Sequence, residues 1–391
     1  MSNRRDFDKA VRKVKTLPIS PDDETLLRLY ALFKQVEAGD VEGKMPFAKG
    51  MVAVAKYKAR KKCIGISEDD AITAYVGLVE ECFARQLEQD GQEKQKKSDP
   101  VVDDSVVILD AAGRIDDWSK KTVLVSGASR GIGKAVALRF ASAGANLILL
   151  GRTLLPEQVS GNKSGSLSET KLEVEELGAK ALCVATDVRD EAAVATAVAA
   201  GITEFGGIDA VVCNAGALFI APFEDTPMKR FDLVHQVNVR ATFSLCQAAL
   251  PALKASERGR ILVLAPPISL EPKWFDGTLA YTISKYGMSM LVIGLAAEMN
   301  ESGVAVNAMW PATTIDTAAV RLNKALGGDE MARRSRKPTI CADAAFEILS
   351  RPSEHSGQFH TDESALREIG VKDFSSYAVE AGQPLQKDFY L

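Results

Sequence analysis

From Lys120 onward, short apolar segments alternate with longer amphipathic segments, and no other feature of the sequence constrains the fold so strongly. The apolar segments have the length of buried strands, and the amphipathic segments have the periodicity of helices. Strands that alternate with helices form a parallel sheet covered by helices on both faces. We therefore expect a doubly wound parallel α/β domain with the strands TVLVS, NLILL, ALCVA, AVVC, ILVLA and VAVNAM.

The chain before this domain has a different character. Residues 1–88 contain no convincing strand, and their apolar residues recur at helical spacing. Residues 89–117 are polar and charged, which is typical of a linker. Because 391 residues are enough for more than one domain, we expect an all-α domain at 1–88, a linker at 89–117 and the α/β domain at 118–391.

Composition and charge exclude several classes of protein. The formal net charge is -4 and neither part of the chain is strongly basic, so no nucleic-acid partner is expected. No stretch approaches the ~20 apolar residues of a membrane span, and no secretory or peroxisomal signal is visible. The six cysteines include no Cys-x-x-Cys pair, so neither a metal site nor a disulfide framework is predicted. We expect a cytoplasmic protein, with a peroxisomal or mitochondrial location left open.

The first strand runs into a glycine-rich turn that a helix follows. Glycines let the backbone turn tightly and let a pyrophosphate approach the amides at a helix N-terminus. A glycine turn can also be purely structural, so this motif alone is weak. As a cofactor loop it comprises Gly127, Ser129, Arg130, Gly131, Ile132 and Gly133.

Three later motifs strengthen this interpretation. Asn214-Ala215-Gly216 ends the fourth strand, Asn238 lies in a helical segment, and Tyr281 and Lys285 stand four residues apart on one helix face. With the glycine loop, these motifs appear in the order typical of the short-chain dehydrogenase/reductase family, which the chain resembles over about 270 residues. The resemblance implies a Rossmann-type sheet, a nicotinamide cofactor and oxidoreductase activity.

The resemblance also implies roles for these residues. A free tyrosine has a pKa near ~10, and a nearby ammonium group lowers it by favouring the phenolate. Tyr281 would exchange a proton with the substrate oxygen, while Lys285 would also bind the nicotinamide ribose. Asn238 would hold a water molecule in the proton path. The motif from Asn214 to Gly216 would line the cofactor cleft, and Val188 and Pro311 are further predicted cofactor contacts.

Charged residues favour one form of the cofactor. An acidic residue at the end of the second strand would favour NAD(H), but Arg152 stands there. Arg130 adds a second guanidinium, and such groups suit a 2′-phosphate. We therefore favour NADP(H) over NAD(H), unless Arg152 is simply solvated. Asp187 matches the acidic residue that contacts adenine in the family.

The family's catalytic serine at the end of the fifth strand is missing. Strand register places Pro266 at that position, whereas the usual spacing to the tyrosine selects Ser269. A narrower resemblance, to the hydroxysteroid dehydrogenase-like protein 2 branch, includes the paired prolines and Pro311-Ala312 after the sixth strand. Ser269 is therefore a candidate catalytic residue whose orientation the sequence leaves open.

The N-terminal part resembles the acyl-CoA-binding protein family, a four-helix bundle. The similar segments are LLRLYALFKQVEAGDVEG, AKYKARKK and ISEDDAITAYVGLVEE. Ligand residues of that family match Tyr30, Lys34, Lys56 and Tyr75. The lysines would bind the phosphates of coenzyme A and the tyrosines its adenine and phosphate edges. The alternative is a helical bundle that no longer binds this ligand.

Two functions from different classes follow. The first is an NADP(H)-dependent oxidoreductase acting on a fatty acyl-CoA or a related lipid carbonyl or hydroxyl, with the acyl-CoA-binding module supplying substrate. The second is an acyl-CoA carrier whose reductase domain binds NADP(H) with little turnover. The resemblance also implies a homodimer or homotetramer formed through the reductase domain, because members of the family usually pair their long helices.

Overall fold

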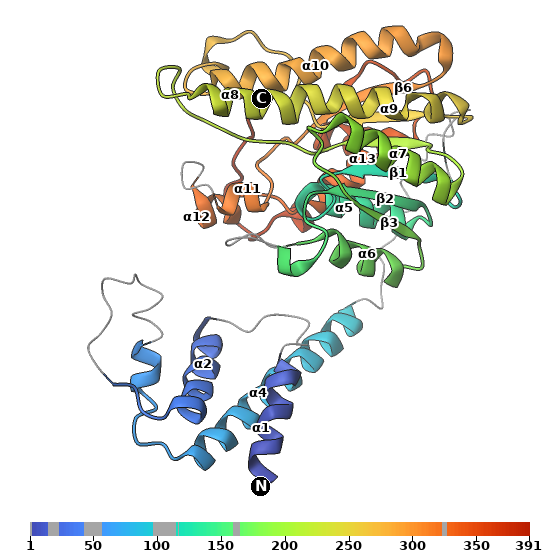
Figure 1. Cartoon of the computed structure of the whole chain (residues 1–391). Helices are drawn as coiled ribbons and strands as arrows, with labels where there is room; N and C mark the ends of the chain where they lie inside the picture. Colours follow the sequence, from blue (N-terminus) through green and yellow to red (C-terminus); the bar gives the residue numbers. More distant parts are fainter. Residues whose placement is uncertain are drawn as a thin grey trace. The chain divides into compact units, whose positions relative to one another are not determined.

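The structure is a computed structural model that describes residues 2–14, 23–42, 57–96, 115, 117–158, 165–322 and 327–391. It divides into two compact units, Met1–Asp104 and Ser105–Leu391 (Figure 1).

The first unit is built from helices. Its helices are α1 (Ser2–Lys13), α2 (Asp23–Ala38) and α4 (Glu68–Lys96), with a further helical turn at residues 57–61. Phe7 is almost fully buried, and its ring lies 5.0 Å from the ring of Tyr75 on α4. Ser67 caps α4, because its hydroxyl accepts a hydrogen bond from the amide of Asp70 at 3.2 Å. An apolar core thus joins α1, α2 and α4.

The second unit is a parallel sheet of seven strands (Figure 1). The strands are β1 (Thr122–Ser126), β2 (Asn146–Gly151), β3 (Ala181–Ala185), β4 (Ala210–Cys213), β5 (Arg260–Val263), β6 (Ala305–Trp310) and β7 (Phe359–Thr361). The longer helices are α5 (Gly131–Ser142), α6 (Leu167–Glu176), α7 (Glu191–Phe205), α8 (Met228–His235), α9 (Ala241–Ala255), α10 (Leu279–Met299) and α13 (Thr339–Ser350). Shorter elements are η4 (Gln236–Arg240), η5 (Pro272–Trp274), α11 (Ala318–Arg321), α12 (Gly328–Arg333) and α14 (Asp362–Glu368).

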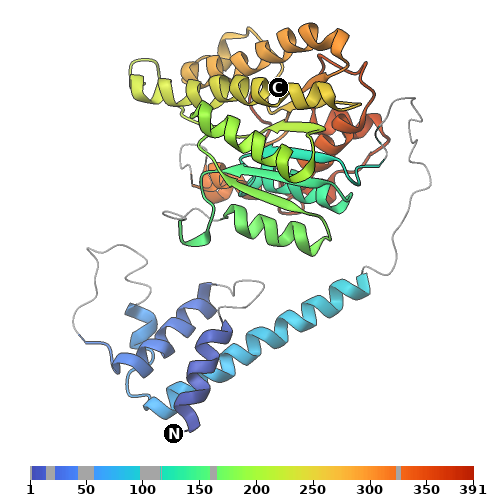
Figure 2. The same ribbon diagram turned by 45° about the vertical axis from the view of Figure 1, so that its right-hand side comes forward.

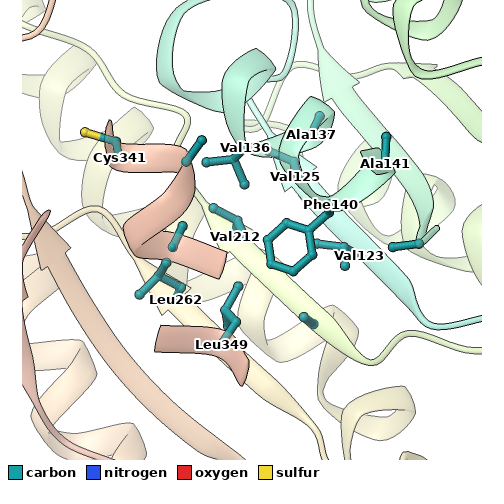
Figure 3. Packing of buried hydrophobic residues seen from close by; sticks show 14 of the residues in the cluster. Val123, Val125, Val136, Ala137, Phe140, Ala141, Val212, Leu262, Cys341 and Leu349 are labelled. Carbon is teal, nitrogen blue, oxygen red and sulfur yellow. The ribbon is translucent and has the colours of Figure 1, made fainter. Parts of the chain in front are cut away.

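Helices cover both faces of this sheet, as the sequence predicts (Figure 2). Side chains of α5, α6 and α13 pack on one face, and those of α7, α9 and α10 pack on the other. Successive strand residues point to opposite faces, so Val123 and Leu124 belong to different cores. Figure 3 shows Phe140 of α5 beside Val123 and Val212 in the first of these cores.

The order of the strands positions the functional site. The sheet runs β3-β2-β1-β4-β5-β6-β7, so the chain proceeds in one direction from β1 to β3 and in the other from β4 to β7. Ligands of such sheets bind in the crevice beyond the carboxyl ends of the strands at this reversal. The glycine loop after β1 and the Asn214 motif after β4 both lie at this point.

The structure adds details that the sequence does not indicate. Strand β7 has three residues, too few for a recognisable pattern. Helix α4 continues to Lys96, into the stretch predicted as a linker. Among the described residues, one helical stretch, Leu279–Ser302, is long and apolar enough for a membrane span, but half of its most apolar window is buried in the fold. That burial is typical of a core helix.

Candidate active site

A cavity of about 1190 Å³ opens at the reversal of the strand order. It lies beyond the carboxyl ends of β1 and β4 and is lined by both motifs there, together with residues of α10 and of the C-terminus. The predicted site residues that line it are Gly127, Ser129, Arg130, Gly131, Ile132, Arg152, Asp187, Val188, Asn214, Ala215, Gly216, Tyr281, Lys285 and Pro311. Gly133, Asn238 and Ser269 do not line it.

The glycine loop leaves no space for a side chain at Gly127 or Gly133. Gly127 has φ of +71°, a left-handed conformation that favours glycine. A Cβ atom at Gly133 would lie 2.4 Å from both the carbonyl oxygen of Gly127 and the side-chain amide of Asn214. The loop therefore lies directly against the end of β4. Helix α5 begins at Gly131, so its N-terminus and the positive end of its dipole are at the cavity.

Asn214 ties the ends of two neighbouring strands together. Its side-chain amide donates to the carbonyl oxygens of Ser126 at 2.9 Å and Gly127 at 3.3 Å. In return, the hydroxyl of Ser126 accepts hydrogen bonds from the backbone amides of Asn214 and Ala215, each at 3.0 Å. These bonds hold the glycine loop in position from the β4 side.

Two arginines, Arg130 and Arg152, line the cavity. Burial and the neighbouring charge of Arg152 lower the pKa of Arg130. Both carboxylate oxygens of Asp187 accept hydrogen bonds from Nε of Arg189, at 3.0 and 3.1 Å. The negative charge of Asp187 is therefore shared with a third arginine and does not fully neutralise Arg130 and Arg152. The hydrogen bond from Arg189 and the charge of Arg152 both lower the pKa of Asp187. Two guanidinium groups that line one cavity favour an anionic ligand.

Tyr281 and Lys285 reach the cavity from α10. Both are largely buried. The ammonium of Lys285 donates to the carbonyl oxygen of Leu264 at 2.7 Å and lies 5.1 Å from the centre of the Trp310 ring. Burial lowers the pKa of Lys285 to about 7, whereas the charge of Asp388 raises it.

The pKa of the Tyr281 phenol differs from the expectation based on the sequence. Burial raises its pKa well above the usual value, and the charges of Tyr390 and Asp388 add to the increase. The sequence predicts the opposite direction because it considers only the ammonium four residues away. Burial is a property of the folded cavity, and the spacing of two residues does not reveal it.

Asn238 lies in a single turn of π-helix, a feature that often occurs at functional sites. Its side-chain oxygen accepts from the backbone amide of Ala217 at 2.8 Å, and its amide donates to the carbonyl of Ala217 at 3.0 Å. The same amide donates to the hydroxyl of Ser284 at 2.9 Å, and Ser284 donates to the carbonyl of Tyr281 at 2.7 Å. Asn238 thus connects the Asn214 motif to the helix of Tyr281.

The stretch after β5 keeps Ser269 out of the cavity lining. The phenol of Tyr286 donates to the carbonyl of Ser269 at 2.7 Å and accepts from its amide at 3.2 Å. The Ser269 hydroxyl accepts from the amide of Glu271 at 3.4 Å. Pro266 is buried, and its carbonyl accepts from Ser289 at 2.7 Å. Neither position therefore brings a hydroxyl to Tyr281.

Sequence reasoning missed the residues that the C-terminus contributes. Residues Gln386, Lys387, Asp388, Phe389 and Leu391 line the same cavity as Tyr281. Trp274 and Trp310 line it too and add aromatic surface. The narrower resemblance extends over the last residues of the sequence, FSSYAVEAGQPLQKDFYL, but it assigns none of them a place at the site.

The predicted ligand residues of the first unit are partly described. Tyr30 and Lys34 are half-buried and lie one helical turn apart on the same face of α2. Tyr75 is buried in the core of the unit, where burial raises the pKa of its phenol. Lys56 lies outside the described residues. Tyr30 and Lys34 are the described pair that a ligand could reach together.

Known families match both units. The model of the short chain dehydrogenase family matches residues 121–325, and the model of the acyl CoA binding protein family matches residues 4–79. Hydroxysteroid dehydrogenase-like protein 2 of Homo sapiens is 45% identical over 270 residues, which cover 69% of this chain and 63% of that protein. The match therefore spans less than two thirds of that relative.

Solved structures resemble the second unit. A putative dehydrogenase from Xanthomonas campestris is 41% identical, with a TM-score of 0.67, and the match covers 70% of this chain and 99% of that one. A metagenomic short-chain oxidoreductase in complex with NADP is 25% identical, with a TM-score of 0.51, over 62% of this chain and 96% of that one.

Proposed function

The chain belongs to the short-chain dehydrogenase family, and on that premise we propose that it is an NADP(H)-dependent oxidoreductase acting on the carbonyl or hydroxyl group of a fatty acyl-CoA or a related lipid. Its family makes it an oxidoreductase with a nicotinamide cofactor. The acyl-CoA-binding domain at residues 4–79 is the reason for proposing an acyl-CoA substrate.

The residues around the cavity fit a nicotinamide dinucleotide. The glycine loop would hold the pyrophosphate where a Cβ at Gly133 would collide with its neighbours. Arg130 and Arg152 would bind a 2′-phosphate, because two guanidinium groups line the cavity where NAD(H)-binding sites carry an acidic residue. Asp187 would contact the adenine. This arginine pair is the reason for preferring NADP(H).

One observation carries the proposed reaction: Tyr281 and Lys285 line the same cavity as the cofactor loop. When bound, the nicotinamide supplies or accepts a hydride. Tyr281 gives its phenolic proton to the substrate oxygen during reduction and takes a proton back in the reverse direction. The charge of Lys285 favours the phenolate that remains after proton transfer. Asn238 acts through the backbone by holding Ala217 and Ser284 in place.

The lining of the cavity suits a lipid. It includes the side chains of Leu218, Leu233, Val237, Trp274, Trp310 and Phe389. Sites for small ligands are mostly apolar with a few polar groups that orient the ligand, and this region has that character. The intact tyrosine–lysine pair favours 3-oxoacyl-CoA reduction, or its reverse, over dienoyl-CoA reduction.

A spectrophotometric screen tests the proposal. The full-length chain is mixed with NADPH and with 3-oxoacyl-, enoyl- and dienoyl-CoA substrates of several chain lengths, and absorbance at the nicotinamide band is followed. We expect oxidation of NADPH with 3-oxoacyl-CoA that is lost in Tyr281→Phe. The absence of turnover with every class of substrate would reject the proposal.

An acyl-CoA carrier is the second candidate function. Its support is the missing serine, because Pro266 takes the strand position and Ser269 does not line the cavity. It predicts tight binding of acyl-CoA and NADPH with negligible oxidation in the same screen. Tyr281, Lys285 and Asn238 are intact, which favours the enzyme.

We further propose that the chain forms a homodimer or homotetramer through α9 and α10. Large apolar residues on these helices are exposed, with Phe243 at 58%, Met290 at 61% and Ile293 at 51%. Exposed apolar groups of this kind often mark interfaces. Light scattering after size exclusion measures the mass, and a strictly monomeric chain would contradict the proposal.

A further inference from the structure

The ammonium of Lys285 is held by contacts from three elements of the second unit. It donates to the carbonyl oxygen of Leu264, just after β5, at 2.7 Å, and to the sulfur of Met288 on α10 at 3.4 Å. It also lies over the indole ring of Trp310 at the end of β6, 5.1 Å from the centre of the ring. These distances place Trp310 directly beside the ammonium that the proposed reaction uses.

The positive charge of Lys285 is buried without a direct counter-ion. The side chain is 6% exposed, so water solvates little of the charge. In the part of the chain that the structure describes, a carbonyl, a thioether and an aromatic ring contact the ammonium, and no carboxylate forms an ion pair with it. The face of an aromatic ring is negative, and its attraction for a cation is greatest for indole and for desolvated pairs. Trp310 is thus suited to compensate the buried charge.

The indole ring of Trp310 is itself fixed in place. Its N–H group donates to the carbonyl oxygen of Phe389 at 2.9 Å. The ring lies 5.6 Å from the ring of Tyr390, and both are buried in one cluster with Tyr286. The hydroxyl of Tyr390 lies 3.2 Å from the hydroxyl of Thr282 on α10. Rotation of the indole away from Lys285 would break the hydrogen bond and disrupt the cluster.

We propose that Trp310 is a positioning residue for Lys285, whose ammonium it holds at the site through a cation–π interaction. The proposal rests on the proposed oxidoreductase function, because the place and charge of Lys285 matter through Tyr281. Neither the dehydrogenase motifs nor the strand pattern assigns Trp310 a role. Trp310 acts through Lys285 and need not touch the substrate.

The charged and titratable groups around Lys285 make a neutral partner useful. Burial lowers the pKa of Lys285 to about 7, and the charge of Asp388 raises it. Burial raises the pKa of Asp388 to about 7, so this carboxyl group carries only part of a charge near neutral pH. Burial also raises the pKa of the phenols of Tyr281 and Tyr390, which are therefore uncharged there. The indole face, by contrast, does not titrate and attracts the ammonium at every pH.

The direct test weakens the ring face and keeps its shape. Position 310 of the whole chain receives tryptophan analogues with increasing numbers of fluorine atoms, which withdraw electron density from the ring face. Lysine is labelled with 13C at its ε carbon, the Lys285 resonance is assigned with Lys285→Arg, and the chemical shift is followed against pH. We expect the Lys285 pKa to fall stepwise, by about one unit over the series. An unchanged pKa across the series would overturn the proposal.

Trp118 is the matched control. It is a buried tryptophan of the same unit, its ring packs 4.7 Å from the ring of Phe140, and it does not line the cavity. The same analogues at position 118 should leave the Lys285 pKa at its wild-type value. An equal fall from fluorine at either position would show a general effect of fluorination and would also overturn the proposal.

Two substitutions separate the ring face from the indole hydrogen bond. Trp310→Phe and Trp310→Leu both remove the donor to Phe389, and only the first keeps an aromatic face. We expect a lower Lys285 pKa in Trp310→Leu than in Trp310→Phe, and equal values in the two folded variants would contradict the proposal. Thermal unfolding checks that both variants fold. Should Trp310→Leu fail to fold, the fluorinated series decides by itself.

A kinetic test follows if the wild type turns over. Lys285 is charged below its pKa, so a lower pKa removes the charged form at lower pH. The alkaline fall of kcat/KM should therefore move to lower pH as fluorine is added at position 310. An alkaline limb that stays in place would refute the role of Trp310. A shifted Lys285 pKa in a protein without turnover would reject the proposed function alone.

Discussion

The side-chain amide of Asn214 lies 2.9 Å from the carbonyl oxygen of Ser126, so the ends of β4 and β1 are joined across the reversal of the strand order. The same amide would be 2.4 Å from a Cβ atom at Gly133. The Asn214 side chain therefore both joins the ends of β1 and β4 and requires a glycine at position 133.

Gly133→Ala should disrupt the cofactor loop. Its methyl group would collide with Asn214 and with the carbonyl of Gly127, and such overpacking costs about 1–3 kcal/mol of unfolding free energy. We expect a lower melting temperature of the reductase unit and loss of NADPH binding, measured by fluorescence quenching. Gly207→Ala is the control, because no atom lies within 4 Å of its added Cβ. Wild-type NADPH affinity in Gly133→Ala would refute this account of the loop.

Arg152→Ala should weaken binding of NADPH more than binding of NADH. A hydrogen bond to a charged group contributes about 1.5–3 kcal/mol, which corresponds to about tenfold or more in Kd. Arg240→Ala is the control, since Arg240 is exposed, pairs with Glu191 at 3.0 Å and does not line the cavity. Equal losses for the two cofactors would show that Arg152 does not recognise the 2′-phosphate.

Ser269→Ala should leave turnover nearly unchanged. The Ser269 hydroxyl accepts from the Glu271 amide and does not line the cavity, so we expect kcat/KM within about twofold of wild type. Ser284→Ala, which removes the link between Asn238 and the backbone of Tyr281, should reduce kcat more. A large loss in Ser269→Ala alone would mean that the loop moves when substrate binds.

Lys34→Ala should weaken binding of palmitoyl-CoA to the full-length chain. Removal of one phosphate contact should raise Kd by about tenfold, as titration calorimetry can measure. Lys9→Ala is the control, because Lys9 is an exposed lysine of α1. If both variants bind palmitoyl-CoA equally, Lys34 is not a ligand residue.

Much of the fold could be predicted from the sequence. The buried strands β1 to β6 are continuous apolar segments such as Val123–Val125, and such segments can be recognised in a single sequence. Strand β7 could not be found, because its three residues carry no periodicity. The continuation of α4 to Lys96 was also missed, since its charged end looks like a linker.

The sequence predicts the site residues whose positions are set by short motifs within one strand–turn or one helix. The glycine loop, the Asn214 motif and the pair Tyr281 and Lys285 all reach one cavity, because each lies at a fixed offset from a strand or helix. Ser269 shows the limit, since a residue count does not reveal which way a loop turns. Asp388 lies more than a hundred residues from Lys285 in the sequence, and only tertiary packing brings both to the cavity.

The central claim is that Tyr281 supplies the proton that accompanies hydride transfer from NADPH to an acyl-CoA carbonyl. The most direct measurement uses NADPH deuterated at the transferable position, a 3-oxoacyl-CoA substrate and mass spectrometry of the product. We predict deuterium at carbon 3 of the hydroxyacyl product for the wild type, and none for Tyr281→Phe with NADPH binding retained. A wild-type chain that binds NADPH yet transfers no deuterium, or equal transfer by Tyr281→Phe, would contradict the account.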